Sequence, residues 1–300
     1  MKDVRADAVP VPMVGRPQGA LADYVALTKP RLNLLVVATS AAGYYLGASS
    51  VAFVPMAEAV AGTALVAAGA AVLNQVYERD TDALMRRTRM RPLPDGRIGT
   101  AEARVFGIGL GGAGLVVLAM GANALAALLA AITLVTYLIV YTPMKRRSTA
   151  ATLVGAVPGA LPPLIGWAAA HGSVSIGGWT LFAIVFLWQI PHFMAIAWMC
   201  RDDYGKAGFP MLPVIEPDGR RTGRQAVAYA ACLVPVSLVP TFVGVSGSIY
   251  FWIALLLGAA LLALSIRFAR SRNERSARAL FFGSIVYLPL IWAAMILNHR

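Results

Sequence analysis

Nine long apolar segments, joined by short polar loops, constrain this chain more than any other feature of its sequence. A bilayer core needs about 20 residues of helix and offers the backbone no hydrogen-bond partners, so such segments predict membrane-spanning helices. The composition agrees, because 58% of the 300 residues are hydrophobic and only 13% are charged. We therefore predict an all-α integral membrane protein, a bundle of nine transmembrane helices. The predicted spans are Leu32–Gly47, Val54–Tyr77, Ala103–Met120, Ala122–Tyr141, Ala150–Ala170, Trp179–Cys200, Gln225–Val245, Ile249–Phe268 and Ala279–Asn298.

Lys and Arg residues occur only in alternate loops. They precede the first span and fill the loops after the second, fourth, sixth and eighth spans, while Arg300 alone falls on the other side. By the positive-inside rule this pattern predicts a cytosolic N-terminus and an external C-terminus in a bacterial plasma membrane. The net charge of +12 lies between apolar spans, which favours lipid headgroups and phosphorylated substrates over nucleic acid as partners.

The N-terminal segment has a different character. Residues 1–22 lack the apolar core and cleavage pattern of a signal peptide and are interrupted by Pro10, Pro12 and Pro17. We predict that residues 1–22 form a disordered cytosolic tail and that residues 23–300 form a single membrane domain.

An acidic motif ends the second predicted span. Asn74, Glu78 and Asp82 recur every four residues, so on a helix they form one stripe. Two carboxylates on one stripe repel each other, and a divalent cation would relieve that repulsion. Oxygen ligands suit Mg²⁺, which bridges phosphates, and Arg87 and Arg91 could donate charge-assisted hydrogen bonds to those phosphates. The motif predicts a diphosphate site, and the alternative is an ordinary solvated loop beside a span.

A second acidic sequence, CRDDYGKAGFPMLP, follows the sixth predicted span. It places Asp202 and Asp203 on the same face of the membrane as the first motif, with Lys206 behind them. A lone Asp-Asp pair is weak evidence, but the match in residue type, side and position favours a metal diphosphate held between the two loops.

Two glycine-rich patterns have a structural explanation. The sequence GIGLGG, Gly107 to Gly112, matches a dinucleotide fingerprint by letter but lies inside an apolar span with no preceding strand. The spacing of small residues in GAVPG, Gly155 to Gly159, is likewise typical of close helix packing. Both patterns therefore predict helix contacts.

Seven motifs, taken in order, resemble the intramembrane aromatic prenyltransferase superfamily that includes the 4-hydroxybenzoate polyprenyltransferases. The resemblance covers nearly the whole chain from Asp23 onward, and WQIPHF with DYGKAGFPMLP is typical of the branch that uses heme. The motifs are LTKPR (Leu27–Arg31), N-x3-E-x3-D (Asn74–Asp82), RTRMRPLP (Arg87–Pro94), YTPMKR (Tyr141–Arg146), GALPPLIGW (Gly159–Trp167), WQIPHF (Trp188–Phe193) and DYGKAGFPMLP (Asp203–Pro213).

This resemblance implies a lipid-open cavity, a cytosolic Mg²⁺ site and transfer of a farnesyl group from farnesyl diphosphate to a vinyl group of heme b. It implies that Glu78, Asp82 and Asp203 are the catalytic residues and hold the diphosphate through Mg²⁺. Ala207 stands where many members have a second acid, which leaves the number of Mg²⁺ ions open. The product would pass to a heme A synthase or to terminal oxidase assembly. The other implied substrate contacts are Asn74, Arg87, Arg91, Lys145, Arg146, Trp188, His192, Tyr204 and Lys206.

His192 lies inside a predicted span. An ionisable residue there is a functional candidate by default, and imidazole can bind heme iron; the alternative is a helix-packing residue that is hydrogen-bonded to a neighbour. Two other functions stay open: a prenyltransferase for a phenolic or quinone-precursor acceptor, and a membrane transporter. A transporter predicts charges at the bilayer midplane, but these spans are almost uncharged, with Glu58 near the outer edge.

Overall fold

The computed structural model describes residues 19–300, and the regular secondary structure of this part of the chain is helical, apart from one isolated bridge between Ser246 and His299. Residues 1–18 of the predicted tail lie outside the described residues, and residues 20–22 belong to the first helix. The all-α prediction is confirmed. The elements are α1 (Ala20–Leu27), α2 (Pro30–Gly47), α3 (Phe53–Leu84), α4 (Thr100–Gly121), α5 (Ala124–Val135), the π-helix η1 (Thr136–Tyr141), α6 (Thr142–Met144), α7 (Ala151–His171), α8 (Ile176–Met199), α9 (Arg201–Lys206), α10 (Leu212–Ile215), α11 (Arg220–Phe242), α12 (Ser248–Ser271) and α13 (Glu274–Leu297).

Within residues 19–300, eight helical segments are long and apolar enough to cross a membrane. They are α3, α4, the continuous run from α5 through η1 to α6, α7, α8, α11, α12 and α13. The predicted count of nine is therefore wrong by one on this measure. The first predicted span is helical as α2, but polar residues such as Arg31, Asn33 and Ser40 lower the hydropathy of its 18 residues.

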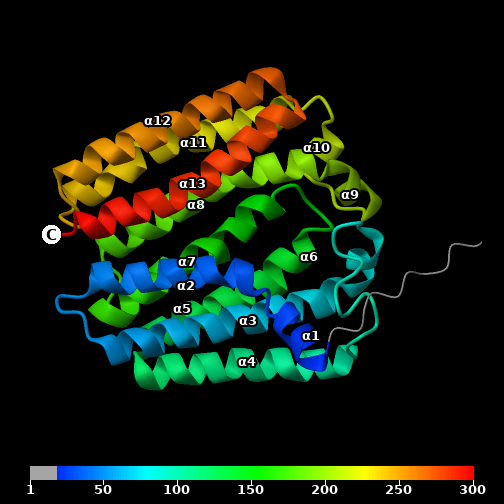
Figure 1. Ribbon diagram of the computed structural model, residues 1–300, viewed down its shortest axis with the longest axis horizontal. Coiled ribbons are helices and arrows are strands. Elements are labelled where there is room, and N and C mark those ends of the chain that lie inside the picture. The colour runs from blue at the N-terminus through cyan, green and yellow to red at the C-terminus, as the bar shows by residue number, and fades with distance from the viewer. Residues whose placement is uncertain (1–18) are drawn as a thin grey trace, which may run out of the picture.

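The long helices run side by side along one direction, as Figure 1 shows. One group contains α8, α11, α12 and α13, the other contains α3, α4 and α5, and α2 packs against α7 between them. The short elements α6, α9 and α10 lie at the same end of the bundle as the last turns of α3 (Figure 1). This arrangement brings the two acidic motifs to one end of the molecule.

Glycines allow the helices of the second group to approach closely. A Cβ atom added to Gly69 on α3 would lie 2.6 Å from the backbone nitrogen of Gly111 and 2.7 Å from the carbonyl oxygen of Gly107 on α4. No side chain fits at that separation, so the backbones themselves are in contact. The packing interpretation of GIGLGG is confirmed.

Helix α1 is tied to α3 and to the loop that follows it. The buried carboxylate of Asp23 pairs with Arg97, and the side-chain amide of Gln75 donates to the carbonyl of Leu27 at 2.6 Å. Leu27 is fully buried in a cluster with Leu93 and neighbouring apolar residues. These contacts fix the position of Lys29, which follows α1 directly.

Candidate active site

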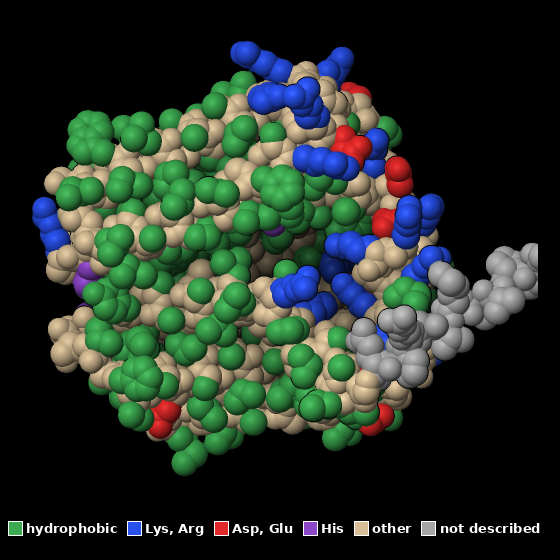
Figure 2. Space-filling view, in the orientation of Figure 1, with side chains coloured by type: hydrophobic (Ala, Val, Ile, Leu, Met, Phe, Trp, Pro, Cys, Tyr) green, Lys and Arg blue, Asp and Glu red, His purple; other side chains and the backbone are tan. Residues whose placement is uncertain are grey.

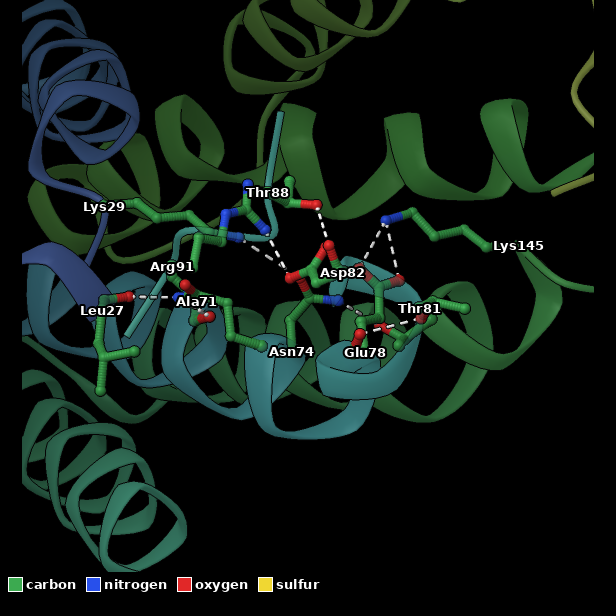
Figure 3. Close-up of polar contacts among 12 residues, drawn as sticks. Leu27, Lys29, Ala71, Asn74, Glu78, Thr81, Asp82, Thr88, Arg91 and Lys145 are labelled. Atoms are coloured by element: carbon green, nitrogen blue, oxygen red, sulfur yellow. Dashed lines mark hydrogen bonds and ion pairs between the residues drawn. The ribbon is translucent and has the colours of Figure 1, made fainter. Parts of the chain in front are cut away.

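The last turns of α3 carry the predicted stripe of polar side chains. Asn74, Glu78 and Asp82 are buried, with Glu78 6% and Asp82 1% exposed, and they share one face of the helix in Figure 3. Asp80 is exposed, as its position off the stripe predicts. Two carboxylates removed from water are costly unless cations compensate them, so their partners define the site.

Both carboxylates are paired with cations from other parts of the chain. Lys145 places its ammonium 3.0 Å from Oε1 and 3.2 Å from Oε2 of Glu78. Arg91 donates from Nη1 to Oδ2 of Asp82 at 2.7 Å, while the Thr88 hydroxyl donates to the Asp82 carbonyl at 2.7 Å (Figure 3). The stripe is therefore neutralised by two long-range ion pairs.

A third cation, Lys29, reaches the stripe from the connection between α1 and α2. Its ammonium donates to Oδ1 of Asn74 at 3.4 Å, and its backbone is left-handed, with φ 50° and ψ 58°. A non-glycine residue in this region directly before Pro30 is strained, and such strain gathers at functional sites. Burial lowers the pKa of Lys29 to about 7, and repulsion from Arg91 and Lys145 adds to this effect. Sequence reasoning used the LTKPR motif only as a family signature and missed this residue.

The π-helix η1 shapes the other side of the site. The Thr142 hydroxyl donates to the carbonyl of Tyr137 at 2.7 Å and accepts from the Asn74 amide at 3.2 Å. The Lys145 ammonium lies 4.9 Å from the centre of the Tyr141 ring. A π-helix interrupts the regular helical hydrogen bonding and often occurs at functional sites. Here it precedes Lys145, which follows α6 and faces Glu78.

The environment of Lys145 keeps its side chain charged. Burial alone would lower its pKa, but Tyr141 and the Glu78 carboxylate outweigh that effect and hold the pKa above its ordinary value. Lys145 therefore stays charged near neutral pH, whereas the lowered pKa of Lys29, about 7, makes its charge sensitive to pH in that range. The site therefore contains one ammonium that stays charged near neutral pH and one whose charge depends on the pH.

The second motif lies against the first. The Arg87 guanidinium sits 5.6 Å from the centre of the Tyr204 ring, and the Phe209 ring centre lies 5.9 Å from the Lys145 ammonium. Met85, Ala207 and Phe209 pack together as a small buried cluster. The two loops therefore meet at the end of α3, where the sequence placed them.

Other predicted residues are arranged differently. Asp203 is half-buried on α9, and no group of three acidic, His or Cys side chains within residues 19–300 is arranged to hold a metal. Arg146 and Lys206 are exposed. Trp188 is only 5% exposed, so its ring belongs to the core and not to a lining surface. The family resemblance implied a substrate contact for Trp188, but a sequence motif does not reveal burial.

His192 lies on α8, away from the ion pairs, and contacts α13. Its Nδ1 is 2.8 Å from the Ser284 hydroxyl, and its ring stacks with those of Trp188 and Phe281. Figure 2 shows a hollow on the flank of the bundle, with Lys and Arg side chains gathered beside it at the end that carries α9. A hollow that opens along the sides of the helices fits the predicted lipid-open cavity.

The donor atoms of the stripe fit Mg²⁺ with a diphosphate. Glu78 and Asp82 offer hard oxygen ligands on one helix face, with the Asn74 amide oxygen beside them. Mg²⁺ is usually held by one or two carboxylates together with substrate phosphates, so two carboxylates suffice. Lys29, Arg91 and Lys145 supply the positive charge that a diphosphate needs.

Comparison with known proteins defines the class. Residues 35–287 match the model of the UbiA prenyltransferase family. The fold resembles a solved structure of digeranylgeranylglyceryl phosphate synthase, with a TM-score of 0.79 and 18% identity over 93% of this chain and 98% of that one. It also resembles a UbiA homologue from Archaeoglobus fulgidus bound to GPP and Mg²⁺, with a TM-score of 0.64 and 17% identity over 91% and 99% of the two chains. The chain belongs to the UbiA prenyltransferase family.

Close relatives narrow the position within this family. The protoheme IX farnesyltransferase of Solibacter usitatus (strain Ellin6076) is 47% identical over 92% of this chain and 98% of that protein. The protoheme IX farnesyltransferase of Koribacter versatilis (strain Ellin345) is 42% identical over 97% of both chains. The mitochondrial protoheme IX farnesyltransferase of Arabidopsis thaliana is 40% identical over 92% of this chain and 64% of that protein. The family resemblance seen in the sequence is confirmed.

Proposed function

We propose that this chain is an enzyme that transfers the farnesyl group of farnesyl diphosphate to a vinyl group of heme b. The observation that carries this proposal is the buried end of α3, where Glu78 and Asp82 face three cations at the edge of an apolar bundle. The identity of the acceptor rests on the relatives. They are named protoheme IX farnesyltransferases, and this chain aligns with them along nearly their whole length.

The donor substrate binds at the stripe. Glu78 and Asp82 hold Mg²⁺, which when bound supplies positive charge to the departing diphosphate. Lys145 and Arg91 exchange their carboxylate partners for phosphate oxygens, so each of these cations keeps an anionic partner before and after binding. Arg87, Arg146 and Lys206 add charge around the entrance.

Asp203 is a further proposed Mg²⁺ ligand. It lies on the short helix α9, and its neighbour Tyr204 contacts Arg87 from the first motif. This contact holds the second loop beside the diphosphate site. The turnover of Asp203→Asn measures its contribution separately from those of Glu78 and Asp82.

The reaction breaks the bond between farnesyl C1 and the diphosphate oxygen, and the electron pair leaves with the diphosphate. The vinyl π electrons of heme b attack the resulting allylic cation and form the new carbon–carbon bond. Water then adds to the cation left beside the porphyrin ring and loses a proton, which gives a hydroxyethylfarnesyl group. The apolar flanks of the helices keep bulk water from the allylic cation until the vinyl group has reacted.

The chain is integral to a membrane, and we propose the bacterial plasma membrane with the diphosphate site on the cytosolic side. The basic loops gather at the end that carries the stripe, which agrees with the positive-inside rule (Figure 2). Because the product carries a farnesyl chain, it stays in the bilayer, and direct handover to a heme A synthase or an assembling terminal oxidase follows from its chemistry.

The test is an assay of the full chain in nanodiscs with farnesyl diphosphate, Mg²⁺, heme b and 4-hydroxybenzoate together, followed by mass spectrometry. We expect farnesylated heme and loss of the product when Mg²⁺ is chelated. A prenylated aromatic acid without farnesylated heme would contradict the proposal in favour of a phenolic acceptor.

Variants then test the site. Glu78→Gln, Asp82→Asn and Asp203→Asn should each abolish turnover while the protein still inserts. The exposed Asp80 and Asp202 provide matched controls, and Asp80→Asn and Asp202→Asn should be much milder. Near-normal activity at saturating Mg²⁺ would remove the corresponding acid from the metal site.

A further inference from the structure

The hydroxyl of Ser284 on α13 determines which nitrogen of His192 carries a proton. This hydroxyl donates its own hydrogen to the carbonyl of Phe281 at 2.6 Å. Its oxygen therefore has only lone pairs to offer His192 Nδ1, which lies 2.8 Å away. With the hydroxyl hydrogen used in this way, Nδ1 is the donor of the hydrogen bond, and the neutral imidazole has its proton on Nδ1 and a free lone pair on Nε2.

The plane of the imidazole is held by two stacked aromatic neighbours. The Trp188 ring stacks on it at 5.1 Å between centroids and an interplanar angle of 19°, and the Phe281 ring stacks at 5.1 Å and 23°. Trp188 also donates from Nε1 to the carbonyl of Ser284 at 2.7 Å, so α8 and α13 are joined at the same residue. Rotation of the ring would break the stacking and the hydrogen bond together.

The other nitrogen of His192 is left available. Within residues 19–300, Nε2 makes no hydrogen bond, and it is not among the fully buried polar atoms that lack a partner, so it keeps some accessible surface. A packing histidine has no need of an accessible lone pair. An imidazole with Nδ1 hydrogen-bonded, its plane fixed and Nε2 open has the arrangement that metal-ligating histidines show.

We infer that Ser284 is a positioning residue that presents Nε2 of His192 as an axial ligand to the iron of the heme substrate. This inference rests on the proposed function and identifies the side chain that binds the porphyrin substrate. The ion pairs around Glu78 would bind the diphosphate, while His192 on α8 would hold the porphyrin. The two substrates are thus recognised by separate groups, one anchored on phosphate and one on iron.

The experiment uses the purified full chain in nanodiscs, titrated with ferric heme b and, separately, with iron-free protoporphyrin IX. Absorption and electron paramagnetic resonance spectra report the axial ligand. We expect a histidine-ligated spectrum for the wild type, its loss in His192→Ala and its return when imidazole is added. Binding of protoporphyrin IX should be unchanged in His192→Ala, because that probe has no iron to ligate.

Ser284→Ala should retain histidine ligation but bind ferric heme roughly 10-fold more weakly, the scale typical of losing a group that orients a ligand. Ser265 on α12 is a matched control, because it is also fully buried and its hydroxyl donates to the carbonyl of Leu261 at 2.9 Å. Ser265→Ala should bind heme like the wild type. Farnesyl diphosphate binding, measured by calorimetry, should be unchanged in all three variants and verifies that they are folded.

Either of two results would overturn the inference: an unchanged heme spectrum in His192→Ala, or unchanged heme affinity in Ser284→Ala. The proposed function fails in a different way, through absence of farnesylated heme from the wild type. A wild type that farnesylates heme while His192→Ala keeps the wild-type spectrum would refute the iron ligand alone.

Discussion

Replacement of Lys145 by methionine tests whether the buried charges of the stripe are held by their ion pairs. Lys145→Met keeps most of the apolar stem of the side chain and removes the ammonium, which lies 4.9 Å from the centre of the Tyr141 ring. Glu78 is then left as a buried carboxylate without its partner. We expect a large loss of stability, and we expect the double variant Lys145→Met with Glu78→Gln to recover much of it.

The size of the effect follows from the geometry. The side chains of Lys145 and Glu78 are 16% and 7% exposed, and their charged atoms are 3.0 Å apart. At that distance two unit charges attract by about 5.5 kcal/mol at an effective dielectric constant of about 20. Desolvation offsets part of this attraction, and removal of one partner of a buried pair costs about 3–5 kcal/mol. A coupling free energy of at least about 2 kcal/mol should therefore appear in a double-mutant cycle.

The assay is unfolding of the four proteins of this cycle by SDS in mixed micelles. The exposed pair of Arg278 and Glu274, with side chains 63% and 62% exposed, serves as control and should couple by only about 0.3–0.5 kcal/mol. Addition of Mg²⁺ and diphosphate should reduce the coupling between Lys145 and Glu78, because each then gains a new partner. A coupling no larger than that of the control pair would show that Lys145 does not compensate the buried charge of Glu78.

Three further predictions concern packing, protonation and topology. A Cβ atom at Gly166 would collide with the Ser40 carbonyl, so Gly166→Ala should lower thermal stability by several degrees while Gly112→Ala, which meets open space, should not; equal stability would contradict the close contact of α2 with α7. Because burial lowers the pKa of Lys29 to about 7, the ammonium loses its proton above that pH, and diphosphate binding must then take a proton up. Calorimetry should show affinity falling more steeply between pH 7 and 9 in the wild type than in Lys29→Arg, and parallel slopes would exclude Lys29 from the site. In a cysteine-free background, a thiol at position 147 should react with an impermeant reagent only from the cytosolic side and a thiol at position 171 only from outside; the reverse pattern would invert the topology.

Much of the architecture follows from local sequence pattern. Eight of the nine predicted spans are long apolar helices in the structure, because lipid leaves the backbone no alternative to internal hydrogen bonding. The stripe of Asn74, Glu78 and Asp82 was predictable because residues four apart share a helix face. Close packing of the segment with Gly107 and Gly111 against another helix was predictable, and the structure identifies that helix as α3. Each of these inferences needs only residues that are neighbours along one segment.

The partners of the stripe could not be read in the same way. Glu78 and Lys145 are 67 residues apart, Asn74 and Lys29 are 45 apart, and no periodicity relates them. The sequence predicted that the basic residues lie at one end of the bundle, but it did not show which of them pair with the carboxylates. The π-helix before Lys145 and the strained backbone of Lys29 decide that choice, and both depend on packing between helices.

The acceptor side of the site shows the same division. The sequence by itself placed His192 inside a span and left its role open between packing and heme contact. Only the tertiary structure brought Ser284 to its Nδ1, from 92 residues away, and buried Trp188 behind it. Local pattern determines which residues become helical and which face they share, because those are properties of one segment. The tautomer of a histidine and the partner of a carboxylate depend on a second helix, so the fold alone determines them.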